Sequence, residues 1–383
     1  MSIKLVEDTV SKKDISALCK WLKTNPRLTK GDLTLELEKK FAELIGTKYS
    51  VFVNSGSSAN LIMMYMLKVA GHTNVVIPAI CWATDLAPAI QFDMNVHICD
   101  CNLDNLSVDY KALETIFIEK RPTALLLVSV LGMAPNRAAI QYLCDKYKVA
   151  VIEDNCESLL TMIEKSDTYL GGFTPTLMSS FSTFYGHHMS TIEGGFITTN
   201  DRFLYNALLM MRAHGWSRDL SEEDRKTLRN EYNISEWQEK YTFYIEGFNF
   251  RNTEISAFLG LRQLETIKGN IAKRIENSSY FYSKVKTSWK PEVLPTFSMP
   301  LILDSSQQRL DLIKLLDDNQ IENRPLIAGN IARQPVYESF LKGGETYSNA
   351  DIIHDRGMYI PNHHKLLKKD LNLMIRLVNK CLK

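Results

Sequence analysis

The sequence predicts an α/β protein built on a mainly parallel sheet, because short apolar segments of strand character alternate with helical segments. Each apolar segment is only a few residues long and rich in aliphatic side chains, as buried strands are. The predicted strands are 49–53, 75–77, 96–99, 124–130, 150–152, 178–181 and 195–199. The last two have no long helix between them, which leaves room for an antiparallel strand.

The length of the chain allows two domains. It has 383 residues, of which 45% are hydrophobic, and this is enough for one or two substantial cores. A highly charged stretch at 216–237 predicts a surface excursion, and after residue 291 the strands and helices become shorter. We therefore expect a large α/β domain over residues 1–269 and a smaller α+β domain over residues 270–383.

Composition restricts the possible partners. The 45 Lys and Arg residues nearly balance the 44 Asp and Glu residues, so no basic field favours nucleic acid. The seven cysteines are an odd number without disulfide spacing, which indicates reduced thiols of a cytoplasmic protein. No apolar run reaches the roughly 20 residues of a membrane span, and residues 1–20 lack the apolar core of a secretory signal. We expect a cytoplasmic protein whose partners are small molecules or copies of itself.

One run of side chains resembles part of a metal site. His97, Cys99 and Cys101 form a His-x-Cys-x-Cys pattern, but metal sites of this kind need a second group of ligands. We interpret the run as the end of a buried strand and expect no metal.

Three polar segments follow predicted strands, at the edge of the sheet where open α/β proteins bind ligands. The turn Gly56-Ser57-Ser58 is either an ordinary tight turn or a phosphate cradle. The segment 151–157 ends in acidic residues, which serve equally well as a helix cap or as partners of a metal, a ribose or a ring nitrogen. The segment 180–195 holds two adjacent histidines between hydroxyl side chains and glycines. The alternative to a functional pair is that these histidines are surface residues without a role in a site.

Several motifs lie in a recognisable order along nearly the whole chain. They are the early helix that ends at Gly46, Gly56-Ser57-Ser58-Ala59-Asn60, Glu153-Asp154, the stretch from Ser182 to Glu193-Gly194-Gly195, Arg212-Ala213-His214-Gly215, the stretch from Gly247 to Glu254, and Asn323-Arg324-Pro325. Together they resemble the nucleotide-sugar aminotransferases of the DegT/DnrJ/EryC1/StrS family. The resemblance implies fold-type I of the pyridoxal-phosphate enzymes, with a mixed, mostly parallel seven-stranded sheet and a smaller C-terminal domain.

The chain departs from the pattern of that family at one decisive position. Family aminotransferases carry a cofactor-binding lysine five residues after the phosphate-binding serine and six before Glu-Gly-Gly. Counting from Ser182 and from Glu193 leads to the same residue, His187, and no lysine lies between Lys165 and Lys226. This replacement resembles the branch of sugar 3-dehydratases, most closely those that act on GDP-4-keto-6-deoxymannose.

A second branch with the same replacement acts on CDP-sugars and carries an iron–sulfur cluster on cysteines beyond the histidine. Only Cys381 follows His187 in this chain, so the four thiolates of such a cluster cannot be supplied there. We expect no iron–sulfur cluster.

The resemblance implies a set of cofactor contacts. Gly56 and Ser57 would offer backbone N–H groups to the phosphate of pyridoxal or pyridoxamine phosphate, and Ser182 would add its hydroxyl. Asn249 of a partner subunit would complete the phosphate site, which implies a homodimer with shared active sites.

The ring of the cofactor would have three further contacts. Trp82 would stack on it, unless that side chain is a core aromatic. Asp154 would pair with the ring nitrogen and keep it protonated. Glu157 occupies the position that contacts the ring hydroxyl, where the wider family often has an amide.

The implied reaction removes the 3-hydroxyl of a nucleotide-linked 4-keto-6-deoxy sugar, in the deoxysugar biosynthesis that serves the O-antigen of lipopolysaccharide. L-glutamate would supply the amino group, and ammonia would be released. His187 would move the protons, since an imidazole can do so near neutral pH but cannot bind the cofactor covalently in a stable form. His188 would have a supporting or structural role.

Substrate contacts are less defined, and two other functions remain open. Arg218 and Arg324 are candidates for the nucleotide diphosphate, with surface ion pairing as the alternative. Arg251 and His214 are candidates for the pocket near the dimer seam. The other functions are an aminotransferase that uses a lysine from elsewhere in the chain, and a non-catalytic protein that binds nucleotide sugars.

Overall fold

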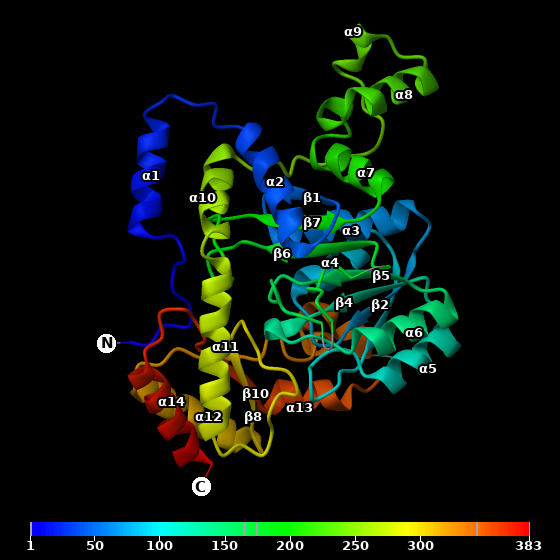
Figure 1. The fold of residues 1–383 in the computed structure, drawn as a ribbon. Helices are drawn as coiled ribbons and strands as arrows, with labels where there is room; N and C mark the ends of the chain where they lie inside the picture. Colours follow the sequence, from blue (N-terminus) through cyan, green and yellow to red (C-terminus); the bar gives the residue numbers. More distant parts are fainter. Residues whose placement is uncertain (1, 164–165, 174, 342–343, 383) are drawn as a thin grey trace.

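A seven-stranded sheet forms the centre of the protein in a computed structural model, which describes residues 2–163, 166–173, 175–341 and 344–382 (Figure 1). Its strand order is β1-β7-β6-β5-β4-β2-β3. The strands are β1 Tyr49–Val53, β2 Asn74–Pro78, β3 Asn95–Cys99, β4 Ala124–Val128, β5 Ala150–Asp154, β6 Met178–Ser182 and β7 Gly195–Thr199. Strand β7 runs antiparallel to β1 and β6, whereas the other pairs are parallel. The predicted mixed, mostly parallel sheet is confirmed.

Helices cover both faces of this sheet because successive strand residues point to opposite sides. Val75 and Ile77 of β2 pack in the same core as α3 and α4, while Val76 packs in the core of α5 and α6. Helices α2 and α10 cover β1, β7 and β6 through a core that contains Phe41 and Phe181. The bounds are α2 Asp32–Ile45, α3 Gly56–Val69, α4 Ala83–Gln91, α5 Tyr110–Lys120, α6 Arg137–Tyr147 and α10 Glu254–Leu264.

A smaller antiparallel sheet, in the order β8-β10-β9, lies beyond the large one. It shares a core with α11, α12 and α14. The bounds are β8 Met299–Ile302, β9 Arg324–Pro325, β10 Gly357–Ile360, α11 Ile267–Lys284, α12 Ser306–Asp318, α13 Ser348–Arg356 and α14 Lys368–Cys381. In Figure 1, α10 and α11 form a column from the large sheet to the smaller one. Helix α11 spans residues 269 and 270, between which we divided the chain into two domains. That domain division stays a prediction.

The N-terminal segment also joins the two parts of the fold. Ile3 forms a bridge with Ile321, which precedes β9. Thr9 accepts a hydrogen bond from the backbone N–H of Ser190 at 3.0 Å, close to the paired histidines. The segment therefore connects the smaller layer to the large sheet before α1 (Lys12–Leu22) begins.

The charged stretch at 216–237 folds into a short helical excursion. It contains η2 (Ser217–Asp219), α8 (Glu222–Tyr232) and the start of α9 (Glu236–Glu239), after α7 (Arg202–Arg212). Figure 1 shows α8 and α9 projecting away from the sheets. The remaining short turns are η1 Val130–Gly132, η3 Ile331–Arg333 and η4 Pro335–Leu341. None of the helices described here is both long and apolar enough to cross a membrane.

Candidate active site

A cavity of about 590 Å³ opens at the carboxyl ends of the parallel strands. Its walls combine loops of the large sheet with Phe297, Ile327 and Tyr359 from the smaller layer and Leu5 and Val6 from the N-terminal segment. The predicted site residues that line it are Gly56, Ser57, Trp82, Asp154, Glu157, Ser182 and His187. The fold thus brings together residues from Gly56 to His187, which are 131 positions apart in the sequence.

The start of α3 forms an anion cradle at one end of the cavity. Ser55 caps the helix by accepting a hydrogen bond from Ser58 at 3.0 Å, and helix N-termini present free N–H groups and a positive dipole end. Gly56 is pressed against the end of β6, because a Cβ there would lie 2.8 Å from Cβ of Ser182 and 2.9 Å from Sγ of Cys156. The hydroxyl of Ser182 therefore lies beside the cradle, and the donors suit a phosphate.

Asp154 is held rigidly at the end of β5. Its Oδ1 accepts the backbone N–H of Cys156 at 2.7 Å, and its Oδ2 accepts Nδ2 of Asn60 at 2.5 Å. Asn60 is fixed in turn, because its Oδ1 accepts the hydroxyl of Ser180 at 2.5 Å. Asp154 is 5% exposed and lines the cavity, so one oriented carboxylate faces the space where a ring nitrogen can bind.

Glu153, the residue before Asp154 in β5, has a different role, because successive side chains of a strand point to opposite faces of the sheet. Glu153 is buried and pairs with Nε of Arg137 at 2.7 Å. It also accepts the backbone N–H of Gly171 at 3.1 Å. Glu153 therefore stabilises the packing behind the sheet and does not line the cavity.

Glu157 lines the cavity from the turn after β5. Burial raises the pKa of Glu157 to about 7, although the backbone N–H of Leu131, which donates to it at 2.8 Å, acts in the opposite direction. Glu157 can therefore change its charge near neutral pH. Tyr359 stands close to it, and burial followed by the charge of Glu157 raises the pKa of that phenol.

His187 is oriented by one backbone contact. Its Nδ1 lies 2.6 Å from the carbonyl oxygen of Cys156, which can only accept a hydrogen bond, so Nδ1 carries the proton. In the neutral ring Nε2 is then unprotonated. Burial lowers the pKa of His187, which favours the neutral form. The ring lies 5.1 Å from that of Phe297 and borders the cavity, and no lysine is among the described residues that line it.

His188 turns away from the cavity. It is fully buried, and its Nε2 lies 3.1 Å from Oγ1 of Thr296. Burial, and after it the charge of Arg274, lowers the pKa of His188 well below its usual value. The imidazole of His188 therefore lies at the seam between the two layers, and the supporting or structural role expected for it stays a prediction.

Trp82 lies at the entrance of the cavity with 58% of its surface exposed. It is the N-cap residue of α4, and its backbone N–H donates to Oδ2 of Asp85 at 2.9 Å. The large indole is thus held by its backbone while its face remains open to a ligand.

The predicted substrate residues do not line the cavity of their own chain. Arg251 donates to Oδ1 of Asn249 at 3.0 Å and lies 3.2 Å from Nε2 of His214, so these three residues form one cluster. Arg324 of β9 is paired in register with Tyr359, which does line the cavity.

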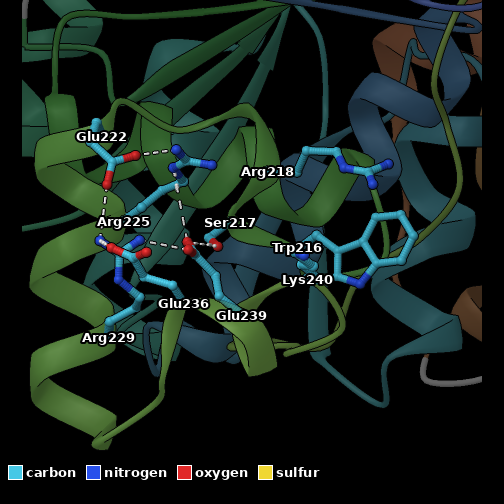
Figure 2. Close-up of a pocket in the computed structure, with 9 residues that line it drawn as sticks. All are labelled: Trp216, Ser217, Arg218, Glu222, Arg225, Arg229, Glu236, Glu239 and Lys240. Carbon is cyan, nitrogen blue, oxygen red and sulfur yellow. Dashed lines mark hydrogen bonds and ion pairs between the residues drawn. The ribbon is translucent and has the colours of Figure 1, made fainter.

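Arg218 lies in a separate, charged pocket on the helical excursion. Figure 2 shows its side chain beside Trp216, across the pocket from the acidic side chains of α8 and α9. Its guanidinium carbon is 5.0 Å from the centre of the Trp216 ring, which is a cation–π distance.

Several cavity residues carry no local signal in the sequence. Phe297, Ile327 and Tyr359 reach the cavity only because the smaller layer packs against the large sheet. In the sequence Asp85, near the start of α4, looks like an ordinary capping residue. Asn60 belongs to the Gly56-Ser57-Ser58-Ala59-Asn60 motif, but nothing in the sequence indicates that it bonds to Asp85. Among the described residues no group of three or more metal-ligating side chains comes together.

The model of the DegT/DnrJ/EryC1/StrS aminotransferase family matches residues 9–379 of the chain. The chain belongs to this family. A relative from Yersinia pseudotuberculosis, described as GDP-4-keto-6-deoxy-D-mannose 3-dehydratase, is 31% identical over 397 aligned positions that cover 99% of each chain.

Solved structures of family members agree with this assignment. A mutant of GDP-4-keto-6-deoxymannose-3-dehydratase with bound GDP-perosamine superposes with a TM-score of 0.87 and 27% identity, over 98% of this chain and 100% of that one. The same enzyme with a trapped PLP-glutamate geminal diamine gives a TM-score of 0.84 and 27% identity over 100% of both chains. The fold is therefore that of the pyridoxal-phosphate aminotransferases.

The cradle at Gly56 leads to a first prediction for this family member. A methyl group in Gly56→Ala forces Ser182 or Cys156 aside, and overpacking of this kind costs about 1–3 kcal/mol. We expect the Kd for pyridoxal phosphate to rise about tenfold to hundredfold, measured by quenching of protein fluorescence. Gly269→Ala is the matched control, since a Cβ at Gly269 meets nothing within 4 Å. Equal affinity of the two variants would contradict a phosphate cradle.

Glu157 leads to a prediction about pH. Because its folded-state pKa of about 7 exceeds the unfolded value of about 4.3, its contribution to stability is complete below the unfolded value and is lost as the pH rises through 7. Without cofactor, the free energy of unfolding should fall less between pH 5 and pH 8 for Glu157→Gln than for the wild type, by about 1–3 kcal/mol, and the Tm should change in the same direction. Glu276→Gln removes an exposed partner of Lys273 and should follow the wild-type curve. Parallel curves for all three proteins would show that Glu157 stays ionised.

Proposed function

We propose that this protein is a pyridoxamine-phosphate-dependent 3-dehydratase of a nucleotide-linked 4-keto-6-deoxy sugar, with GDP-4-keto-6-deoxymannose as the substrate. The reaction uses L-glutamate as amino donor and yields a 3-deoxy-4-keto sugar and ammonia. The observation that carries the proposal is His187: it borders the cavity with a free Nε2, and the described lining residues include no lysine. The names of the similar proteins and their bound GDP-sugar and glutamate support the choice of substrates.

The residues of the cavity fit the cofactor. We assign the phosphate to the backbone N–H groups of Gly56 and Ser57 and the hydroxyl of Ser182, the ring face to Trp82, and the ring nitrogen to Asp154. When bound, pyridoxamine phosphate supplies a primary amine for the sugar ketone and a ring that accepts electrons. Glu157 then lies where a hydrogen bond to a ring substituent is possible, in either charge state.

His187 carries the proton transfer. Its Nε2 is the only ring nitrogen free to act, because Nδ1 is bound to Cys156. As a neutral base it accepts a proton at Nε2, and as an imidazolium it returns that proton to the departing 3-hydroxyl. A lysine amine at this position would itself attack the cofactor and favour amino transfer. The imidazole can thus transfer protons without forming a covalent bond to the cofactor.

The remaining site residues belong to a proposed homodimer. The cluster of Asn249, Arg251 and His214 lies outside the cavity of its own chain, as expected if it completes the site of a second subunit. Arg324, next to Tyr359 in the smaller sheet, suits a nucleotide diphosphate at the entrance, and we keep Arg218 as a second candidate. We place the protein in the cytoplasm and its product in the synthesis of lipopolysaccharide O-antigen.

The first test is chemical trapping. After incubation with pyridoxal phosphate and reduction with borohydride, the intact mass of the wild type should not increase by one cofactor. His187→Lys provides the positive control and should become labelled. A labelled cavity lysine in the wild type would favour the alternative, an aminotransferase.

The second test is turnover. The protein with pyridoxal phosphate, L-glutamate and GDP-4-keto-6-deoxymannose should release one ammonia for each 3-deoxy sugar formed. Binding of the sugar without ammonia release would favour the non-catalytic binder.

A further inference from the structure

A second buried carboxyl group stands beside the one that faces the cofactor ring. Asp85 of α4 is 1% exposed and Asp154 is 5% exposed, and a single nitrogen joins them. Nδ2 of Asn60 donates to Oδ1 of Asp85 at 2.8 Å and to Oδ2 of Asp154 at 2.5 Å. The two acids therefore share one neutral donor group, with no cation between them.

Among the residues that the structure describes, no lysine or arginine faces the second carboxylate. The titratable side chains that face the pair are Cys81, Cys156, Glu157 and His187, with Tyr337 approaching Cys81 from η4. Burial lowers the pKa of His187 and so favours its neutral form. Two carboxylates in one buried site repel each other and are costly to ionise together. One proton on the pair removes this cost.

Burial distinguishes the two acids, because their contacts do not. Each accepts two N–H groups, Asp154 from Cys156 and Asn60, and Asp85 from Asn60 and the backbone of Trp82, and each lines the cavity. Asp85 is the more buried of the two, with 1% of its surface exposed against 5% for Asp154. Burial, followed by the charge of Asp154, raises the pKa of Asp85 well above its usual value, which places the proton on Asp85.

We propose that Asp85 is a positioning residue that stands as a neutral carboxylic acid and holds Asn60 and Trp82, so that Asp154 presents a single negative charge to the ring of the cofactor. Through Asn60 it sets the orientation of the Asp154 carboxylate. Through its bond to the backbone of Trp82 it sets the start of α4 and thereby the stacking face. The inference rests on the cofactor site alone and does not depend on which sugar is the substrate.

Two substitutions of Asp85 separate its acceptor oxygens from its charge. Asp85→Asn is neutral and keeps one of the two acceptor oxygens, whereas Asp85→Ala removes the acceptors of both Asn60 and Trp82. At pH 7 we expect Asp85→Asn to bind pyridoxamine phosphate more tightly than Asp85→Ala, with a Kd less than about tenfold above that of the wild type, and to keep the absorbance spectrum of the protonated ring. Asp85→Ala should weaken binding at least about tenfold, a loss equivalent to roughly one ordinary hydrogen bond, with a spectrum shifted toward the unprotonated ring.

Each alternative result is decisive. If Asp85→Asn binds as poorly as Asp85→Ala, a neutral side chain with an acceptor oxygen does not hold Asn60 and Trp82, and the proposal is contradicted. If both variants bind like the wild type, Asp85 has no positioning role. Because the measurement uses pyridoxamine phosphate without sugar, failure of the 3-dehydratase proposal does not affect its outcome.

A stability measurement keeps the proposal testable even if Asp85→Ala does not fold. A raised folded-state pKa means that the contribution of Asp85 to stability is complete below the unfolded value of about 3.9 and is lost as the pH rises through the folded value. Without cofactor, the Tm of Asp85→Asn minus that of the wild type should therefore increase by about 3 °C or more from pH 5 to pH 9. Asp109→Asn, which changes an N-cap residue away from the cavity, should show no such trend. A constant difference for Asp85→Asn would overturn the proposal.

Discussion

Replacing His187 with asparagine is expected to lower kcat for ammonia release by about 10²–10⁴-fold, the usual contribution of a general acid–base group. The asparagine amide can still donate to the carbonyl of Cys156 and fill the same position, but it cannot accept a proton near neutral pH. The Kd for the cofactor should stay within about threefold of the wild-type value, because the imidazole does not contribute to the phosphate cradle. Steady-state ammonia release and fluorescence titration measure the two quantities.

His188→Asn is the matched control for this experiment. His188 is adjacent in sequence but faces Thr296 at the seam between the layers, so its substitution should lower the Tm and leave kcat within about threefold. If His187→Asn kept more than a tenth of the wild-type kcat, the imidazole would not be the proton-transfer group.

The pH profile provides an independent check on His187. The base works in its neutral form, and burial lowers its pKa below the ordinary value of 6.5. The acid limb of kcat/KM for the sugar should therefore lie below pH 6.5, and His187→Asn should lack it.

Replacing Arg212 with methionine is expected to lower the free energy of unfolding by about 3–5 kcal/mol, because it leaves the buried carboxylate of Glu38 without its cation. The half-buried Asp219 keeps Lys30 as a partner at 3.1 Å. Arg212 is fully buried at the end of α7. Its guanidinium pairs with Glu38, with Oδ2 of Asp219 at 2.9 Å, and with the carbonyl of Phe52 in β1 at 3.0 Å. Urea denaturation monitored by circular dichroism measures the loss.

Arg202→Met is the control on the same helix. Arg202 is 54% exposed in its side chain and pairs with Asp224 at 3.0 Å, and exposed ion pairs of this kind contribute about 0–1 kcal/mol. Comparable losses in the two variants would mean that the buried network around Arg212 does not hold α7 to β1.

The same network explains how the Arg212-Ala213-His214-Gly215 motif is held in place outside the cavity. Arg212 fixes the end of α7, and Ala213 then forms a bridge with Asn249. His214 adopts a φ of +64°, a left-handed conformation that is uncommon outside glycine. The backbone thereby places His214 beside Arg251, so a buried ion pair determines the position of the proposed dimer contacts.

Local patterns in the sequence were sufficient for the large sheet, whereas the roles expected of the residues at its edge came from the resemblance to the family. Strands of the sheet are short apolar runs, and the turn at Gly56 needs a residue without a Cβ, so both leave a local signature. The replacement of lysine by His187 could be read by counting between two motifs. Sequence also accounted for Cys99, which is buried at the end of β3 as expected.

Only the tertiary structure decided what surrounds these residues. Tyr359 of β10 and Phe297, which precedes β8, enter the cavity from a part of the chain that is remote in sequence. Asp85 meets Asp154 through Asn60, across two helices and a strand. The protonated nitrogen of His187 is set by the carbonyl of Cys156, which is 31 positions away. Residue types and spacing determine which groups are available. The protonation state and the orientation of these side chains depend on burial and on partners that are distant in sequence. The burial and the partners exist only after the layers have packed together.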